Sequence, residues 1–150
     1  LPSGASWYDW WSGECFAGGE TVTLTASWDR PPLLVREGAD IPLNLAEQHF
    51  AQPADQRGFA VFPPVGVGHV DDAFFEDDGE STAYLDGQRG EWCVRGDADA
   101  TTLRLSVKAT GTAKVPEGGL TVLLPRQEAR DIQLASGRLL SDVPGGGPRP

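Results

Sequence analysis

The chain has 150 residues, with 12 Lys and Arg against 22 Asp and Glu, and a formal net charge of −10. This acidic balance repels nucleic-acid phosphates and anionic lipid headgroups, so we expect neither nucleic acid nor a membrane as a partner. The length fits one ordinary domain or two small ones and is too short for a barrel enzyme of roughly 250 residues. The 19 Gly and 12 Pro residues oppose long helices and predict an all-β fold.

Strand candidates follow one another at short intervals along the chain. Residues 20–26 alternate Val22, Leu24 and Ala26 with Thr, and this period of two predicts a half-buried strand. Strands at 33–36 and 41–43 flank a connection that contains Gly38 and closes either a hairpin or a corner. Further strands are predicted at 58–62, 72–76, 81–85, 92–95, 102–109, 120–124, 131–135 and 138–140. Short strands with this spacing predict an antiparallel β-sandwich.

Two polar segments interrupt the strand pattern. Residues 45–50 have apolar spacing compatible with a helical turn or two and run into the polar stretch 52–57. We therefore predict a connecting segment at 46–57 between two β parts. Residues 144–150 contain only Pro, Gly and one Arg, which predicts a flexible tail.

The densest aromatic signal is the segment Trp7–Trp11, which reads WYDWW. In an extended strand, Trp7, Asp9 and Trp11 lie on one face, and Tyr8 and Trp10 lie on the other. The rings fit two interpretations. They stack on sugar rings, or they cover a core or meet another domain; we favour the second because buried aromatic area dominates such contacts.

Acidic residues crowd around Gly79, from Asp71 to Glu80. A regular calcium-binding loop with Gly79 at its sixth position would put Leu85 at the twelfth, where a carboxylate is required, so that motif fails. An irregular calcium site stays open. Glu76 and Asp78 on one strand face would be ~6.6 Å apart, near the spacing of an inverting glycosidase, but the sequence around them indicates no enclosing pocket.

Other chemistry-bearing residues are isolated in the sequence. Cys15 and Cys93 lie far apart, and His49 and His69 have no neighbour in a metal-binding motif. We therefore predict no catalytic, cofactor-binding or metal-ligating residue, and no cofactor.

The order of several motifs resembles the segment just after the catalytic barrel in glycoside hydrolase family 31, the α-glucosidase and α-xylosidase family. The motifs are LPSG at 1–4, WYDWWSGE at 7–14, GG at 18–19 and DRPPLLVREGADIP at 29–42. Residues 75–84, with FEDDGES and a Tyr, resemble the acidic hairpin of that family's last β domain. The chain departs from the family pattern at Pro31-Pro32, at Leu34 and at Ala39-Asp40, where the family has alanine-isoleucine.

This resemblance implies a partial proximal β domain at residues 1–45, the connecting segment 46–57 and a distal β-sandwich at 58–143. The family's catalytic aspartates correspond to positions upstream of Leu1, so no catalytic role transfers to these residues. The implied function is a non-catalytic scaffold packed on the catalytic barrel of a retaining α-glycosidase. The alternative is a stand-alone carbohydrate-binding β-sandwich. A partial proximal sheet has an unpaired edge, so self-association through the Trp7–Trp11 strand is a further expectation.

Overall fold

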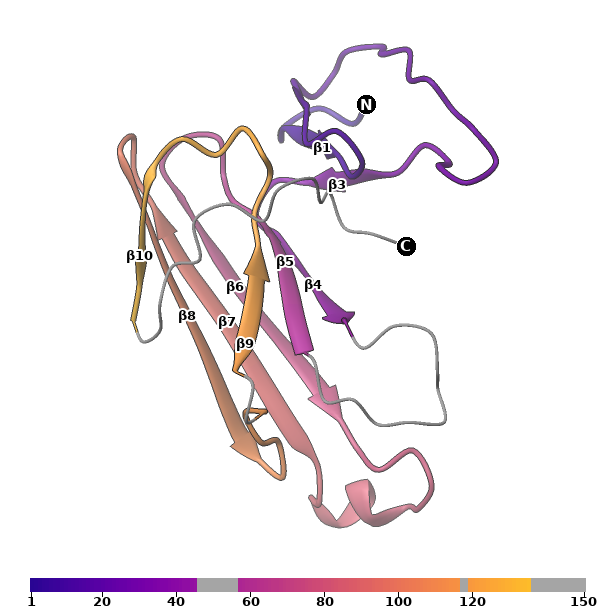
Figure 1. Ribbon diagram of the computed structural model, residues 1–150, viewed down its shortest axis with the longest axis vertical. Helices are drawn as coiled ribbons and strands as arrows, with labels where there is room; N and C mark the ends of the chain where they lie inside the picture. Colours follow the sequence, from indigo (N-terminus) through magenta and orange to yellow (C-terminus); the bar gives the residue numbers. More distant parts are fainter. Residues whose placement is uncertain (46–56, 117–118, 136–150) are drawn as a thin grey trace.

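The computed structural model describes residues 1–45, 57–116 and 119–135. This part of the chain is built from β-strands joined by turns and loops, with one short 3₁₀ helix, η1, at Ala83–Asp86 (Figure 1). The prediction of an all-β fold is confirmed.

The strands form three sheets. A small N-terminal sheet has the order β2 (Cys15–Phe16), β1 (Trp7–Asp9) and β3 (Leu34–Arg36). A second sheet has the order β4 (Ala39–Asn44), β5 (Arg57–Phe62) and β9 (Leu120–Leu123). The third has the order β10 (Asp131–Leu134), β8 (Thr102–Gly111), β7 (Gly90–Ala98) and β6 (Gly68–Glu76). Neighbouring strands are antiparallel, except that β9 is parallel to β5 and β10 is parallel to β8.

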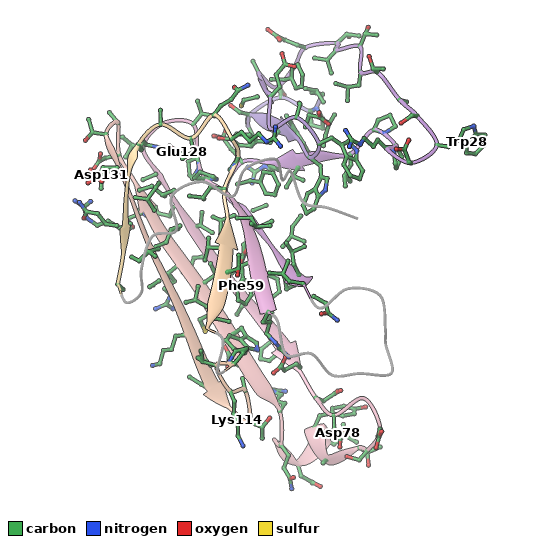
Figure 2. The ribbon with its side chains drawn as sticks, in the orientation of Figure 1. Trp28, Phe59, Asp78, Lys114, Glu128 and Asp131 are labelled. Atoms are coloured by element: carbon green, nitrogen blue, oxygen red, sulfur yellow. The ribbon has the colours of Figure 1, made fainter. Side chains whose placement is uncertain are left out.

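The second and third sheets pack face to face as a sandwich (Figure 1). Every second residue of β7 is buried, as the strand period of two requires, and Trp92 and Val94 form the centre of the core with Phe59. The Phe59 ring lies 5.9 Å from Trp92 and 6.1 Å from Phe74, between ring centroids. Figure 2 shows Phe59 within the body of the sandwich.

The strand β5 is buried on both faces. Phe59 and Val61 point into the sandwich core, whereas Ala60 and Phe62 point to the opposite face. There the N-terminal sheet covers them, and Phe62 lies 5.7 Å from the Tyr8 ring and 5.7 Å from the Trp10 ring. The N-terminal sheet is therefore held in place by the outer face of the sandwich.

The connection around Gly38 is a corner between two sheets. β3 pairs with β1, whereas β4, which follows directly, pairs with β5. Gly38 has φ of 81°, a conformation that favours glycine, and its N–H donates to the Phe62 carbonyl at 2.6 Å. Of the two arrangements that the sequence allowed, the corner is the one formed.

Two predicted strands are wrong. Residues 20–26 keep the predicted alternation of half-buried Val22 and Leu24 with exposed Thr, but they pair with no strand among the described residues. Residues 81–85 run into η1, and the chain re-enters the sheet only at Gly90.

Some predictions fall on residues outside the described ranges. These are the strand at 138–140, the tail 144–150, and most of the helical turn at 45–50 and of the connecting segment 46–57. Of these last two, only Leu45 and Arg57 are described, and Arg57 begins β5. The division into 1–45 and 58–143 stays a prediction.

Candidate functional site

The Trp-rich segment does not continue as a strand beyond Asp9. The Asp9 Oδ2 atom accepts hydrogen bonds from the Ser12 N–H at 3.0 Å and the Ser12 hydroxyl at 2.6 Å. These bonds close a turn that ends at Gly13, whose φ is 73°. Trp10 and Trp11 therefore lie in a turn, and only residues 7–9 present the alternating faces expected of a strand.

The indole rings of this segment are engaged within the chain. Trp10 packs against Phe62, as described above. The Trp7 Nε1 atom donates to the Pro2 carbonyl at 3.1 Å, and the Trp11 Nε1 atom donates to the Pro31 carbonyl at 2.7 Å. Trp10 thus matches the interpretation that the rings cover a core, whereas Trp7 and Trp11 are held by exposed hydrogen bonds to backbone carbonyls.

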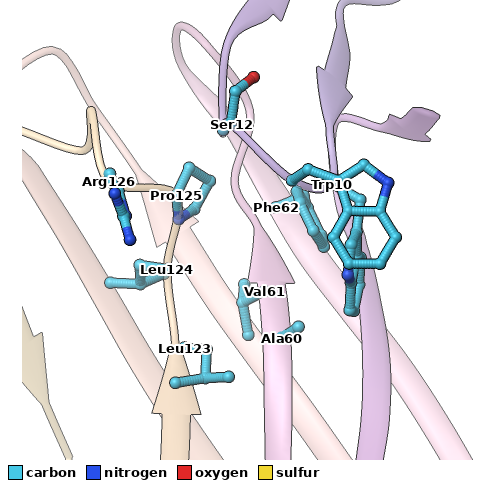
Figure 3. Close-up of a pocket in the computed structure, with 11 residues that line it drawn as sticks. Trp10, Ser12, Ala60, Val61, Phe62, Leu123, Leu124, Pro125 and Arg126 are labelled. Atoms are coloured by element: carbon cyan, nitrogen blue, oxygen red, sulfur yellow. The ribbon is translucent and has the colours of Figure 1, made fainter. Parts of the chain in front are cut away.

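A small pocket lies where the Trp10 turn meets β5 and the end of β9 (Figure 3). Its volume is about 60 Å³, far below the roughly 300 Å³ at which ligand pockets begin. Its walls are mainly apolar, and it is lined by Trp10, Trp11, Ser12, Gly13, Ala60, Val61, Phe62, Leu123, Leu124, Pro125 and Arg126. The pocket has room for small groups only.

A larger cavity of about 560 Å³ lies between the N-terminal sheet and the loops of the sandwich. It is lined by Tyr8, Cys15, Val65, Ala100, Thr101, Pro125, Gln127, Glu128, Ala129 and Arg130. Burial raises the pKa of Tyr8 to about 12. Partial desolvation, followed by the charge of Glu37, raises the pKa of the Cys15 thiol, although the residue as a whole is exposed. Both groups are therefore neutral near pH 7.

The charged wall of this cavity is a closed ion pair. The Arg130 guanidinium donates from Nε to Glu128 Oε1 at 2.7 Å and from Nη2 to Oε2 at 2.5 Å. This pairing holds the pKa of Glu128 below its usual value. Figure 2 places Glu128 in the loop beyond β9. Glu128 is therefore ionised and neutralised, and it is a poor general acid.

The acidic residues around Gly79 shape a loop at the far end of the sandwich (Figure 2). The Asp78 carboxylate accepts hydrogen bonds from the Ser81 hydroxyl at 2.6 Å and from the backbone N–H groups of Ser81 and Glu80, and these bonds lower its pKa. Glu76 forms an ion pair with Arg57. Gly79 has φ of 67°, as expected for the predicted turn. The described residues include no group of three His, Cys, Asp or Glu side chains placed to hold a metal ion.

Sequence reasoning missed Asp40. Its side chain is only 7% exposed, and burial together with the neighbouring Asp72 raises its pKa to about 7. The available signal was the alternation of Ala39, Ile41 and Leu43, which places Asp40 on the other face of β4. That face looks into the sandwich, so Asp40 lies between sheets and outside both cavities.

The remaining predicted candidates are dispersed. Cys15 and Cys93 are free thiols, the first exposed and the second half-buried. His69 pairs with Asp97 at 2.7 Å on the exposed surface, and His49 lies outside the described residues. In the described part of the chain, no helix has the length and apolarity to cross a membrane.

The sequence model of the Glycosyl hydrolase family 31 C-terminal domain matches residues 1–41. Alpha-glucosidase 2 of Bacillus thermoamyloliquefaciens is 23% identical over 112 residues, which is 75% of this chain and 14% of that protein. An alpha-xylosidase of Saccharolobus solfataricus is 32% identical over 113 residues, which is 72% of this chain and 14% of that protein. The match thus covers about one seventh of each relative's length.

Solved structures show the same relationship. A GH31 dextranase of Flavobacterium johnsoniae, complexed with glucose, superposes with a TM-score of 0.57 and 25% identity over 66% of this chain and 12% of that chain. A GH31 alpha-xylosidase of Xanthomonas citri shares the fold with a TM-score of 0.61 and 23% identity over 86% of this chain and 14% of that chain. The chain therefore corresponds to the C-terminal β region of glycoside hydrolase family 31.

Proposed function

We propose that this chain is the non-catalytic C-terminal β region of a glycoside hydrolase that acts on α-glycosidic bonds, and that it serves as a scaffold packed on the catalytic barrel. The observation that carries the proposal is its match to about 14% of the length of proteins named alpha-glucosidase and alpha-xylosidase. The match to a C-terminal domain of that family supports it.

The geometry of the carboxylates supports a role without chemistry. Glycoside hydrolysis needs two carboxyl groups on either side of the bond, one of them with a raised pKa. Glu76 is tied to Arg57, and Asp78 has a lowered pKa within its loop. Asp40 has a raised pKa, but it is buried between two sheets where no sugar reaches it.

An exposed tryptophan offers a contact for the catalytic barrel. Ser27 and Arg30 exchange two backbone hydrogen bonds of 3.2 Å, which closes a tight turn with Trp28 at its tip. Trp28 is fully exposed and projects from the molecule (Figure 2). A large ring on an ordered turn is a typical interface anchor, because little conformational entropy is lost when it is buried.

Two experiments test the scaffold role. The purified chain should not hydrolyse aryl α-glucosides or aryl α-xylosides, and turnover that disappears in Glu76→Gln or Asp78→Asn would contradict the proposal. In a chimaera, this chain replaces the matching segment of the Saccharolobus solfataricus alpha-xylosidase, and we expect activity to be retained. Deletion of the same segment should abolish activity, and Trp28→Ser in the chimaera should lower its thermal stability.

The alternative is a carbohydrate-binding module, and the half-buried Trp10 and Trp11 beside the small pocket favour it. Calorimetry with maltose and xylo-oligosaccharides separates the two functions, because a scaffold gives no saturable heat. Heat that is lost in Trp11→Ala supports the module.

Self-association through the Trp-rich segment is a separate proposal. Light scattering on the wild type and on the variant Trp10→Ser, Trp11→Ser tests it. A wild type that stays monomeric at high concentration counts against it.

A further inference from the structure

The two sheets of the sandwich meet along one side at a seam between β4 and β6. β4 is an edge strand of one sheet and β6 is an edge strand of the other, and the two strands are in contact. The backbone N–H of Asp40 on β4 donates to the Oδ2 atom of Asp72 on β6 at 3.1 Å. This hydrogen bond connects one sheet to the other.

The Asp40 carboxyl group lies inside this seam, and its hydrogen-bonding capacity is largely unused. Its side chain is 7% exposed, and both of its oxygens are buried and accept no hydrogen bond of ordinary geometry in the described part of the chain. An ionised carboxylate in this position would lose its hydration and lie beside the Asp72 charge, and the interaction with the Ile41 backbone N–H offsets only part of this cost. The neutral acid is favoured there, and it has one O–H to donate.

The charged groups around the seam leave Asp72 as the available acceptor. On β6, His69 and Asp71 lie on the outer face, where they pair with Asp97 and Arg95. The ion pair between Arg57 of β5 and Glu76 of β6 lies four residues further along each strand, roughly 13 Å away at ~3.3 Å per residue.

Before β4, the Glu37 carboxylate accepts the backbone N–H groups of Ser6 and Val65, so it is engaged away from the seam. Asp72 is half-buried and already faces the Asp40 backbone. None of the ion pairs found among the described residues includes Asp40, and this favours a proton as the positive charge in the seam.

We propose that Asp40 carries a proton that it directs to Asp72 across the seam, and that this contact is a pH-sensitive latch between the two sheets of the sandwich. With the proton in place, the Asp40 hydroxyl donates to the Asp72 carboxylate and adds to the backbone bond between the strands. Loss of the proton leaves two adjacent carboxylates that repel each other and loosen β4 from β6. The contact between β4 and β6 is therefore firmest when Asp40 is protonated.

The sign of the pH dependence follows from the direction of the shift. The pKa of Asp40 is raised from 3.8 to about 7, so the folded chain binds the proton more tightly than the unfolded chain. The stability supplied by this group is fully present below pH ~4, is lost as the pH rises to about 7, and changes little above that. Carboxylates with a lowered pKa, such as Asp78 and Glu128, destabilise the fold at low pH and oppose this trend. The test therefore uses the difference in stability between the wild type and a variant at each pH.

The test compares the thermal midpoint of the wild-type chain with that of Asp40→Asn from pH 4 to pH 8. The amide introduced by this substitution mimics the neutral acid, so we expect similar midpoints at pH 4 and a midpoint several degrees above the wild type at pH 8. The matched control is Asp71→Asn, which removes an exposed carboxylate from the neighbouring outward-facing position and should keep the wild-type profile.

A second measurement keeps the test valid if Asp40→Asn does not fold. Carboxyl ¹³C NMR of the wild-type chain should show one Asp that titrates near pH 7, and Asp72→Asn should lower that pKa. An Asp40 that titrates near 4, or an Asp40→Asn profile parallel to the wild type, overturns the proposal. Stabilisation of the wild type but not of Asp40→Asn by millimolar Ca²⁺ at pH 8 also overturns it, because the seam would then hold a cation.

Discussion

Replacement of Phe62 by Ala should release the N-terminal sheet while leaving the sandwich folded. Phe62 is 6% exposed and contacts the rings of Tyr8 and Trp10, each at 5.7 Å. Loss of roughly 150 Å² of aromatic surface at about 25 cal/mol per Å² amounts to about 4 kcal/mol. Measured Phe→Ala costs of roughly 3–5 kcal/mol agree with this figure. The buried side chains of the N-terminal sheet are few, so such a loss should exceed what holds it in place.

Hydrogen exchange read by mass spectrometry measures this directly. In Phe62→Ala, amides of β1 and β3 should lose protection, whereas amides of β6, β7 and β8 should keep most of theirs. The matched control is Phe59→Ala, the same change three residues earlier on the opposite face of β5, where the lost contacts are with Phe74 and Trp92. That control should reduce protection in β6 and β7. Unchanged protection of β1 and β3 in Phe62→Ala would refute the reasoning, and so would equal loss in every strand.

Three further changes have defined outcomes. Gly79→Val should lower the free energy of unfolding by about 1–3 kcal/mol, because a β-branched residue is strained at a φ of 67°. No atom lies within 4 Å of an added Cβ, so the cost comes from the backbone and not from a clash. Calorimetry should show a smaller loss for Gly79→Asn. Glu128→Gln should cost about 1.5–3 kcal/mol at pH 7, since it removes the negative charge that pairs with the half-buried Arg130 guanidinium and leaves it only the Gly66 and Asp99 carbonyls. The pKa of Glu128 is lowered in the folded chain, so this stability is present above pH ~4.5 and is lost as the pH falls; a urea midpoint difference that persists at pH 2 would contradict it. Trp28→Ala should change the urea midpoint by no more than the equivalent of about 0.5 kcal/mol while removing the most red-shifted and quencher-accessible part of the Trp fluorescence.

Local signals in the sequence predicted most of the sandwich. Alternation and Gly-containing turns placed the strands around Phe59, Trp92 and Leu103 close to where they form, because their inward residues are apolar at a period of two. The parallel pairing of β9 with β5 and of β10 with β8 is not encoded locally. It depends on partners tens of residues away, which no window along the chain can show.

The two wrong strands have different physical causes. Residues 20–26 have the right alternation, but a strand also needs a neighbouring strand to pair with, and none of the described strands pairs with this segment. Residues 81–85 were read as a strand, but the Ser81 and Asp78 side chains bind nearby backbone groups and bend the chain into η1.

Asp40 was missed for a third reason. A single carboxylate between apolar neighbours in a strand usually predicts an outward-facing residue. Here Ala39 and Ile41 pack against the N-terminal cluster on one face of β4, and Asp40 is buried on the other face.

The position of β5 has a consequence for the order of events when the chain is synthesised. Residues 1–36 are synthesised before the strand that buries them. Tyr8 and Val35 pack against Ala60 and Phe62, which belong to residues 57–62. β5 in turn gains its second neighbour only when residues 120–123 appear. Pairings between such distant segments are slow to form, and until then aromatic side chains face water. The nascent chain should therefore depend on chaperones until residues 120–123 have left the ribosome, and pauses in translation before residue 120 should increase aggregation.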